Sequence, residues 1–138
     1  MPSSTARTCK LIRTQDVFTG KQAFTYRKGV TAENTGSRGL SMHLLTIPPG
    51  ERSRPHLHEG HESAVYVISG RSGLWYGENL EEHVRVDSGD FVYIPPGVPH
   101  LPYNASETEP CVAVIARTDP NEQESVRLLP ELDGIHDR

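Results

Sequence analysis

GERSRPHLHEGHE, residues 50–62, and GDFVYIPPGVPHLPYN, residues 89–104, are the two stretches that decide the fold of this chain. His56 and His58 lie two positions apart, so on a β-strand their side chains point to the same face, about 6–7 Å apart along the strand. His100 follows a stiff, proline-rich turn, which limits the entropy that a side chain loses when it binds a ligand. Together the two stretches predict a metal site carried by β-strands.

The rest of the chain consists of short apolar runs separated by turn residues. It contains 12 glycines and 11 prolines in 138 residues. Strand-like runs at this spacing predict an all-β sandwich or barrel. The runs span residues 39–47, 63–68, 73–76, 84–86, 91–94 and 111–115. One segment with helical periodicity, residues 121–129, ends before Pro130, so one short C-terminal helix or turn is expected beside the strands.

The length of the chain predicts one domain over residues 1–138, which is large enough to bury its own core. No linker, internal repeat or low-complexity tract divides it. We place the core that carries the two histidine stretches at about residues 40–118. Both polar ends, residues 1–8 and 131–138, are expected to be less ordered.

The two histidine stretches resemble the paired signature of the cupins. In the second cupin motif, a glycine and five residues precede Pro-x-Gly, which is followed by two residues, a histidine, three residues and an asparagine. Gly89, Pro95, Gly97, His100 and Asn104 match it at every spaced position. The resemblance implies a single-domain small cupin of the RmlC-like branch, which folds as a double-stranded β-helix, or jelly-roll barrel.

In the first cupin motif, a glycine and five residues precede His-x-His, followed by three or four residues, a glutamate, six residues and a glycine. Gly50, His56 and His58 match its beginning. By resemblance, the metal ligands would be the three histidines and one carboxylate, His56, His58, Glu62 and His100.

The end of the first motif departs from the cupin pattern. Seven residues separate Glu62 from Gly70, one more than usual, so counting back from Gly70 places the ligand at Ser63. Serine is a poor ligand here, and a bulge or shifted turn that lets Glu62 reach inward is the simpler interpretation. His61 is the rival candidate. We favour Glu62, because a carboxylate completes the mixed ligand set.

Three imidazoles and a carboxylate suit one divalent transition metal ion, which could be iron, manganese, nickel, copper or zinc. Four protein ligands leave two positions free on an octahedral ion, so the metal could polarise a carbonyl or, as iron, bring dioxygen to a substrate. Known cupins include dioxygenases, decarboxylases, isomerases and non-catalytic binders. We expect a metal-dependent enzyme acting on a small organic molecule, or else a metal- or ligand-binding protein without turnover. No catalytic base or nucleophile is identifiable in the sequence.

Charge and hydropathy exclude other classes of partner. A formal net charge of −4 without a basic cluster argues against nucleic acid, and no apolar run is long enough to span a membrane. Arg52 and Arg54 flank the histidines, and we expect them to be solvated rather than to face an anionic substrate. Cys9 and Cys111 are too few for a disulfide framework, which predicts reduced thiols in the cytoplasm.

Assembly is predicted from the edges of the expected sheets. A small barrel of this kind leaves sheet edges exposed, and a second copy of the chain can cover them. We therefore expect a homodimer, with N-terminal strands around residues 9–12 as candidates for exchange between the two copies.

Overall fold

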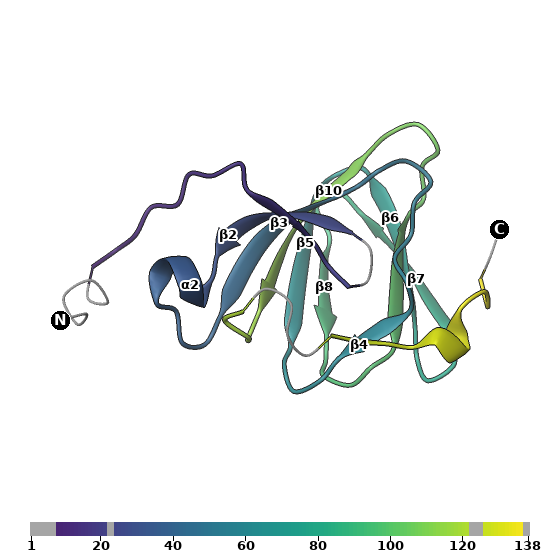
Figure 1. Cartoon of the computed structure of the whole chain (residues 1–138). Coiled ribbons are helices and arrows are strands. Elements are labelled where there is room, and N and C mark those ends of the chain that lie inside the picture. The colour runs from purple at the N-terminus through teal and green to yellow at the C-terminus, as the bar shows by residue number, and fades with distance from the viewer. Residues whose placement is uncertain (1–7, 22–23, 122–125, 137–138) are drawn as a thin grey trace.

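The computed structural model describes residues 8–21, 24–121 and 126–136. Within these ranges, the chain folds into two antiparallel sheets of β-strands that face each other (Figure 1). The larger sheet has the strand order β1-β2-β3-β10-β5-β8, and the smaller has the order β11-β4-β9-β6-β7. The all-β prediction is confirmed. No helix among the described residues is both long enough and apolar enough to cross a bilayer.

Most strands coincide with the predicted apolar runs. The strands of the larger sheet are β1 (Val17–Thr19), β2 (Thr25–Val30), β3 (Ser41–Ile47), β10 (Cys111–Arg117), β5 (Ser63–Ser69) and β8 (Phe91–Ile94). The strands of the smaller sheet are β11 (Val126–Leu128), β4 (His56–His58), β9 (His100–Asn104), β6 (Arg71–Tyr76) and β7 (Glu82–Asp87).

The main core lies between the two sheets. Alternate residues of the central strand β10 are buried, as expected where one face of a strand packs inward. β3 shows the same alternation. The buried residues of this core are Phe24, Tyr26, Leu45, Ile47, Val67, Leu74, Val86, Cys111, Ala113 and Ile115. Because both sheets contribute to it, this core fixes the distance between them.

The C-terminal segment differs from the expected helix. Val126–Leu128 forms strand β11, antiparallel to β4, and a single 3-10 turn, η1 (Pro130–Leu132), follows it. Residues 122–125 lie outside the described residues. Leu129 and Leu132 are buried in a second cluster with Leu57, Leu80 and Leu101. The helix prediction for 121–129 is therefore wrong over its last residues, because pairing with β4 and burial of the leucines override the local periodicity.

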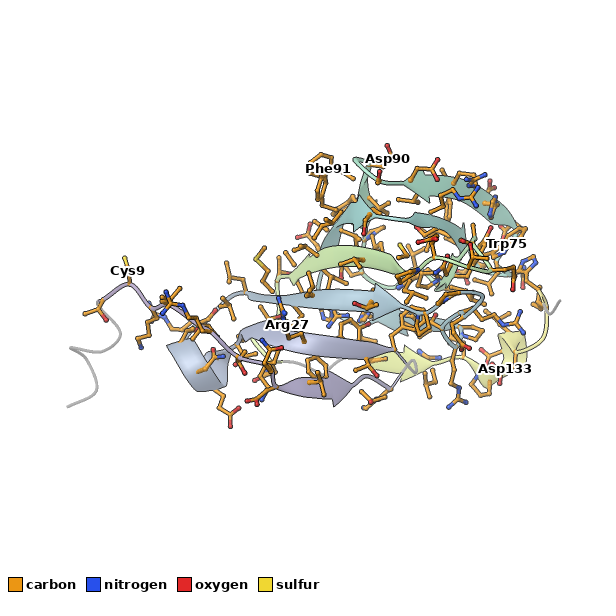
Figure 2. The ribbon with its side chains drawn as sticks, turned by 90° about the horizontal axis from the view of Figure 1, so that it is seen from above. Cys9, Arg27, Trp75, Asp90, Phe91 and Asp133 are labelled. Atoms are coloured by element: carbon orange, nitrogen blue, oxygen red, sulfur yellow. The ribbon has the colours of Figure 1, made fainter. Side chains whose placement is uncertain are left out.

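The N-terminal residues 9–12 form an extended arm rather than a strand. The arm leads away from the sheets on the side of α2 (Ala32–Thr35; Figure 1). Cys9 lies near its outer end (Figure 2). Its side chains are largely exposed; Leu11 is 72% accessible. The first strand begins only at Val17.

Candidate metal centre

Two neighbouring strands of the smaller sheet carry the three predicted histidine ligands. His56 and His58 lie on β4, and His100 begins β9, where its Cα is the partner of the Cα of His56. All three side chains are buried, with 2–3% of each residue accessible. Antiparallel pairing thus brings the two histidine motifs, far apart in the sequence, onto one side of the smaller sheet.

The three imidazoles form one compact group. One ring nitrogen from each lies within 4.8 Å of the others. The ring centroids of His56 and His100 are 4.3 Å apart, and that of His58 lies 5.1 Å from His56 and 5.3 Å from His100. Nitrogen donors this close to one another are candidates for one ion, for which a zinc–nitrogen distance is about 2.0–2.1 Å.

Hydrogen bonds to backbone carbonyls orient two of the rings. Nδ1 of His56 lies 2.7 Å from the carbonyl oxygen of Arg54, and Nδ1 of His100 lies 2.9 Å from that of Val98. Because a carbonyl oxygen only accepts, each Nδ1 carries the proton and each Nε2 keeps a free lone pair. This is the arrangement that fixes the tautomer of metal-binding histidines. Nδ1 of His58 is buried with no hydrogen-bond partner among the described residues.

Burial keeps the three imidazoles neutral, which is the form that binds metal. It lowers the pKa of His100 from the usual 6.5 to about 4, against the raising effect of the hydrogen bond to Val98. It also lowers the pKa of His56 and His58 well below the usual range, and the neighbouring imidazoles add to this effect. A group of buried, neutral, oriented nitrogen donors fits a transition metal ion.

Glu62 lies apart from this group. Its side chain is exposed, and its Oε1 accepts a hydrogen bond of 2.9 Å from the hydroxyl of Tyr93. His61 is buried beside the group, with its ring centroid 4.8 Å from that of His58, and its Nδ1 lies 3.5 Å from Oδ2 of Asp119. The structure thus brings together His56, His58 and His100, and places neither candidate for the fourth ligand among them.

The regular beginning of β5 explains where Glu62 lies. Ser63, the first residue of the strand, is buried. Every second side chain after it, Val65 and then Val67, also faces inward. The strand does contain an irregularity, but at its other end: Ser69 and Val67 pair with adjacent residues of β10, which leaves Ile68 as the extra residue. The bulge therefore accommodates the extra residue without turning Glu62 inward.

Two motif residues outside the candidate ligand set, Asn104 and Gly70, shape turns. Nδ2 of Asn104 donates to the carbonyl oxygens of Ile47, Pro48 and Glu109, at 2.8–3.2 Å, and its Oδ1 accepts from the backbone of Ser106. Gly70 has a φ of +94°, and a Cβ there would lie 2.5 Å from the carbonyl oxygen of Pro110. Both motifs therefore combine candidate ligands with residues that shape the end of the barrel.

Comparison with known proteins agrees with this fold. Residues 43–116, more than half of the chain, match the cupin domain family. The chain belongs to the cupins. A search of curated proteins found no match to this cupin.

Solved structures show the same fold. The polyketide cyclase RemF from Streptomyces resistomycificus has a TM-score of 0.68 and 24% identity, over 88% of this cupin and 86% of that chain. Oxalate decarboxylase from Lactobacillus farciminis, in a formate complex, has a TM-score of 0.69 and 16% identity, over 85% of this cupin and 34% of that chain. Oxalate decarboxylase from Bacillus subtilis has a TM-score of 0.66 and 21% identity, over 77% of this cupin and 28% of that chain. This cupin thus spans about a third or less of either decarboxylase.

A partly open cavity of about 70 Å³ includes the three histidines in its wall. Apolar side chains from both sheets form most of its wall. The cavity also reaches Arg117 at the end of β10, a residue that the sequence analysis did not single out. The predicted run ended at Ile115, yet continuing its period of two places residue 117 on the same inward face. That alternation was the signal that could have found it.

Proposed function

We propose that this cupin is a metal-dependent enzyme that acts on a small organic molecule at a centre formed by His56, His58 and His100. The observation that carries the proposal is the group of buried imidazoles, two of them oriented by backbone carbonyls, in the wall of a cavity. A metal ion held there would supply Lewis acidity or redox chemistry to a substrate bound in the cavity.

The residues of the chain prepare the site in three ways. The carbonyls of Arg54 and Val98 hold the rings of His56 and His100 with a free Nε2. Burial keeps the imidazoles neutral near pH 7. The largely apolar wall of the cavity limits the access of water, which strengthens electrostatic interactions with a bound substrate.

The fourth protein ligand is a separate question. Glu62 stays the prediction from the sequence, and in this structure it would require the turn before β5 to rearrange and the hydrogen bond from Tyr93 to break. His61 is buried closer to the group. With three histidines alone, more positions of an octahedral ion are free for substrate.

A non-catalytic metal- or ligand-binding protein is the second candidate. It is favoured by the composition of the cavity wall, where none of the described lining residues is a carboxylate that could transfer a proton. The Cys111 thiol lines the cavity, but burial raises its pKa and so disfavours the thiolate. Catalysis would then depend on the metal and on groups of the substrate itself.

The reaction is tested with protein loaded separately with iron, manganese, nickel, copper or zinc. Small carboxylic acids, diketones, catechols and sugar phosphates are the substrates, and oxygen uptake, carbon dioxide release and product formation are the readouts. Turnover that requires one metal and disappears in His100→Ala supports the enzyme. Stoichiometric metal binding without turnover on any of these compounds favours the binding protein.

Two further expectations are part of the proposal. Small-molecule enzymes such as oxalate decarboxylase and RemF share the fold, which supports a small organic ligand rather than a macromolecule. Cys9 and Cys111 are both free thiols, which supports the prediction of a reducing, cytoplasmic compartment.

A further inference from the structure

Arg117 is a buried cation in the wall of the cavity. It is the last residue of β10, only 5% of it is accessible, and it lines the cavity with His56, His58 and His100. A fully buried arginine is rare unless its charge is paired, because moving a cation out of water is costly.

No anion of the described chain pairs with Arg117. None of the ion pairs between described residues includes it, and its Nε is buried without a hydrogen-bond partner. Its Cζ lies 5.4 Å from the centroid of the Tyr26 ring, a cation–π contact that places the guanidinium but leaves its donors available. No described residue of the cavity wall is acidic.

The neighbours of Arg117 across the sheet are also polar and lack partners. Its Cα partners are Ser41 on β3 and Ser63 on β5. Both serines are buried on the inward face, and neither hydroxyl has a hydrogen-bond partner among the described residues. Ser63 occupies the position where counting back from Gly70 places the carboxylate of the cupin motif. The protein therefore has a neutral hydroxyl, that of Ser63, where the cupin motif has a carboxylate. The cation of Arg117 lies across from it on the neighbouring strand.

We propose that the cavity binds a small carboxylate or enolate anion, with its negative charge paired with the guanidinium of Arg117 and its other end directed at the three histidines. This inference rests on the proposed metal centre and specifies the class of its substrate. Three neutral imidazoles add no negative charge, so a divalent ion beside Arg117 leaves an excess of positive charge that an anion compensates. A planar carboxylate or enolate also matches the fork of N–H donors of an arginine.

The size of the cavity suits a small anion. Its volume is about 70 Å³. One water molecule needs at least about 10–15 Å³ of such a volume. The cavity therefore has room for a small organic anion of several non-hydrogen atoms, and acetate is its simplest representative.

Acetate and its neutral isostere acetamide test this inference with cobalt-loaded protein. The visible absorption of bound Co²⁺ reports a ligand that enters the site, without any catalytic assay. We expect acetate to change the spectrum of the wild type with a saturable dependence and acetamide to have no effect. Arg117→Gln should retain Co²⁺ and need roughly 10- to 100-fold more acetate, the effect of one lost charge-assisted pair. Arg85→Gln, which removes an exposed surface arginine, is the matched control and should behave as the wild type.

Equal acetate affinity in wild type and Arg117→Gln, or equal binding of acetamide and acetate, would overturn the inference. Circular dichroism establishes whether each variant folds. If Arg117→Gln does not fold, the inference is tested with Arg117→Lys and with the comparison of acetate and acetamide on the wild type. A wild type that holds no Co²⁺ would instead contradict the metal centre. In that case, saturation-transfer NMR with acetate on the metal-free wild type and variants tests the Arg117 site by itself, and no Arg117-dependent signal would overturn it.

Discussion

His56 and His100 face each other across the pairing of β4 with β9, with their ring centroids 4.3 Å apart. Their Nδ1 atoms lie within hydrogen-bonding distance of carbonyl oxygens two residues before each of them, at Arg54 and Val98. The backbone thus orients both rings in the same way from two separate motifs. A preformed pair of this kind loses little entropy when it binds an ion.

The fourth ligand is tested by two adjacent substitutions. Glu62→Gln and His61→Ala should both retain bound metal, because neither side chain belongs to the histidine group. Metal affinity is measured by competition with a chelator of known affinity. Loss of metal in Glu62→Gln alone would show that the turn rearranges as the sequence pattern predicts. Loss in His61→Ala alone would place the fourth ligand there.

Acid should release the metal. The imidazoles bind metal only when neutral, so protons compete with the ion. Burial lowers the pKa of His100 from 6.5 to about 4, so release is expected cooperatively as the pH falls to about 4 and below. Metal content after dialysis at each pH measures this. Half of the metal lost already near pH 6, where the buried imidazoles are neutral, would contradict ligation by this histidine group.

The metal-free protein should lose stability between about pH 6.5 and pH 4. The pKa of His43 is lowered to about 4 by burial and, to a smaller extent, by Arg117 and Lys28. Between about 4 and 6.5, the unfolded chain therefore binds more protons than the folded chain, and the free energy of unfolding falls as the pH falls. At pH 7 the metal-free barrel should remain folded. Circular dichroism that collapses with metal removal at pH 7 would show that the ion is a structural requirement.

Asn104 should contribute to stability rather than to metal binding. It is almost fully buried, and its amide bonds to three carbonyl oxygens and one backbone N–H. Asn104→Ala leaves these buried groups without partners and should cost about 2–3 kcal/mol in urea unfolding. The metal content of the folded variant should stay at the wild-type level. Asn121→Ala, at an exposed position, is the control, and an equal loss in both variants would refute this role.

The chain should form a homodimer. The edge strand β8 carries the exposed aromatic residues Phe91 and Tyr93, 80% and 61% accessible, and Phe91 projects away from the sheets (Figure 2). The exposed N-terminal arm is the second surface that a partner copy could cover. Light scattering during size-exclusion chromatography should give twice the mass of the chain. A monomer at micromolar concentration would contradict this prediction, and a dimer that persists without residues 1–14 would show that the arm is not exchanged.

Local patterns were enough to predict most strands. Residues 91–94 match β8 in full, because apolar residues and a following Pro-Pro-Gly turn define that strand without help from distant residues. The predicted run 111–115 ended two residues before the end of β10, because it was defined by apolar residues and the sequence does not show which strands enclose Arg117. Residues 126–128 read as part of a helix, since the partner strand β4 is distant in the sequence.

The position of Glu62 could not be predicted from spacing. An extra residue before Gly70 predicts an irregularity somewhere, but pairing with β10 decides that it lies at Ile68. The spacing of the motifs also could not predict which arginine lines the cavity. Arg54 is exposed and Arg52 donates to the carbonyl oxygen of His136, while the arginine that lines the cavity is distant from both motifs.

The proposed function depends on one metal ion held by His56, His58 and His100. Elemental analysis of protein purified without a chelator or a metal-affinity step tests it most directly, with His56→Ala, His58→Ala and His100→Ala beside the wild type and His83→Ala, an exposed histidine, as control. We expect about one equivalent of a transition metal per chain in the wild type and in His83→Ala, and little in each of the other three variants. Equal metal content in the wild type and in a folded His100→Ala variant, or a wild type that neither retains nor takes up metal, would contradict it.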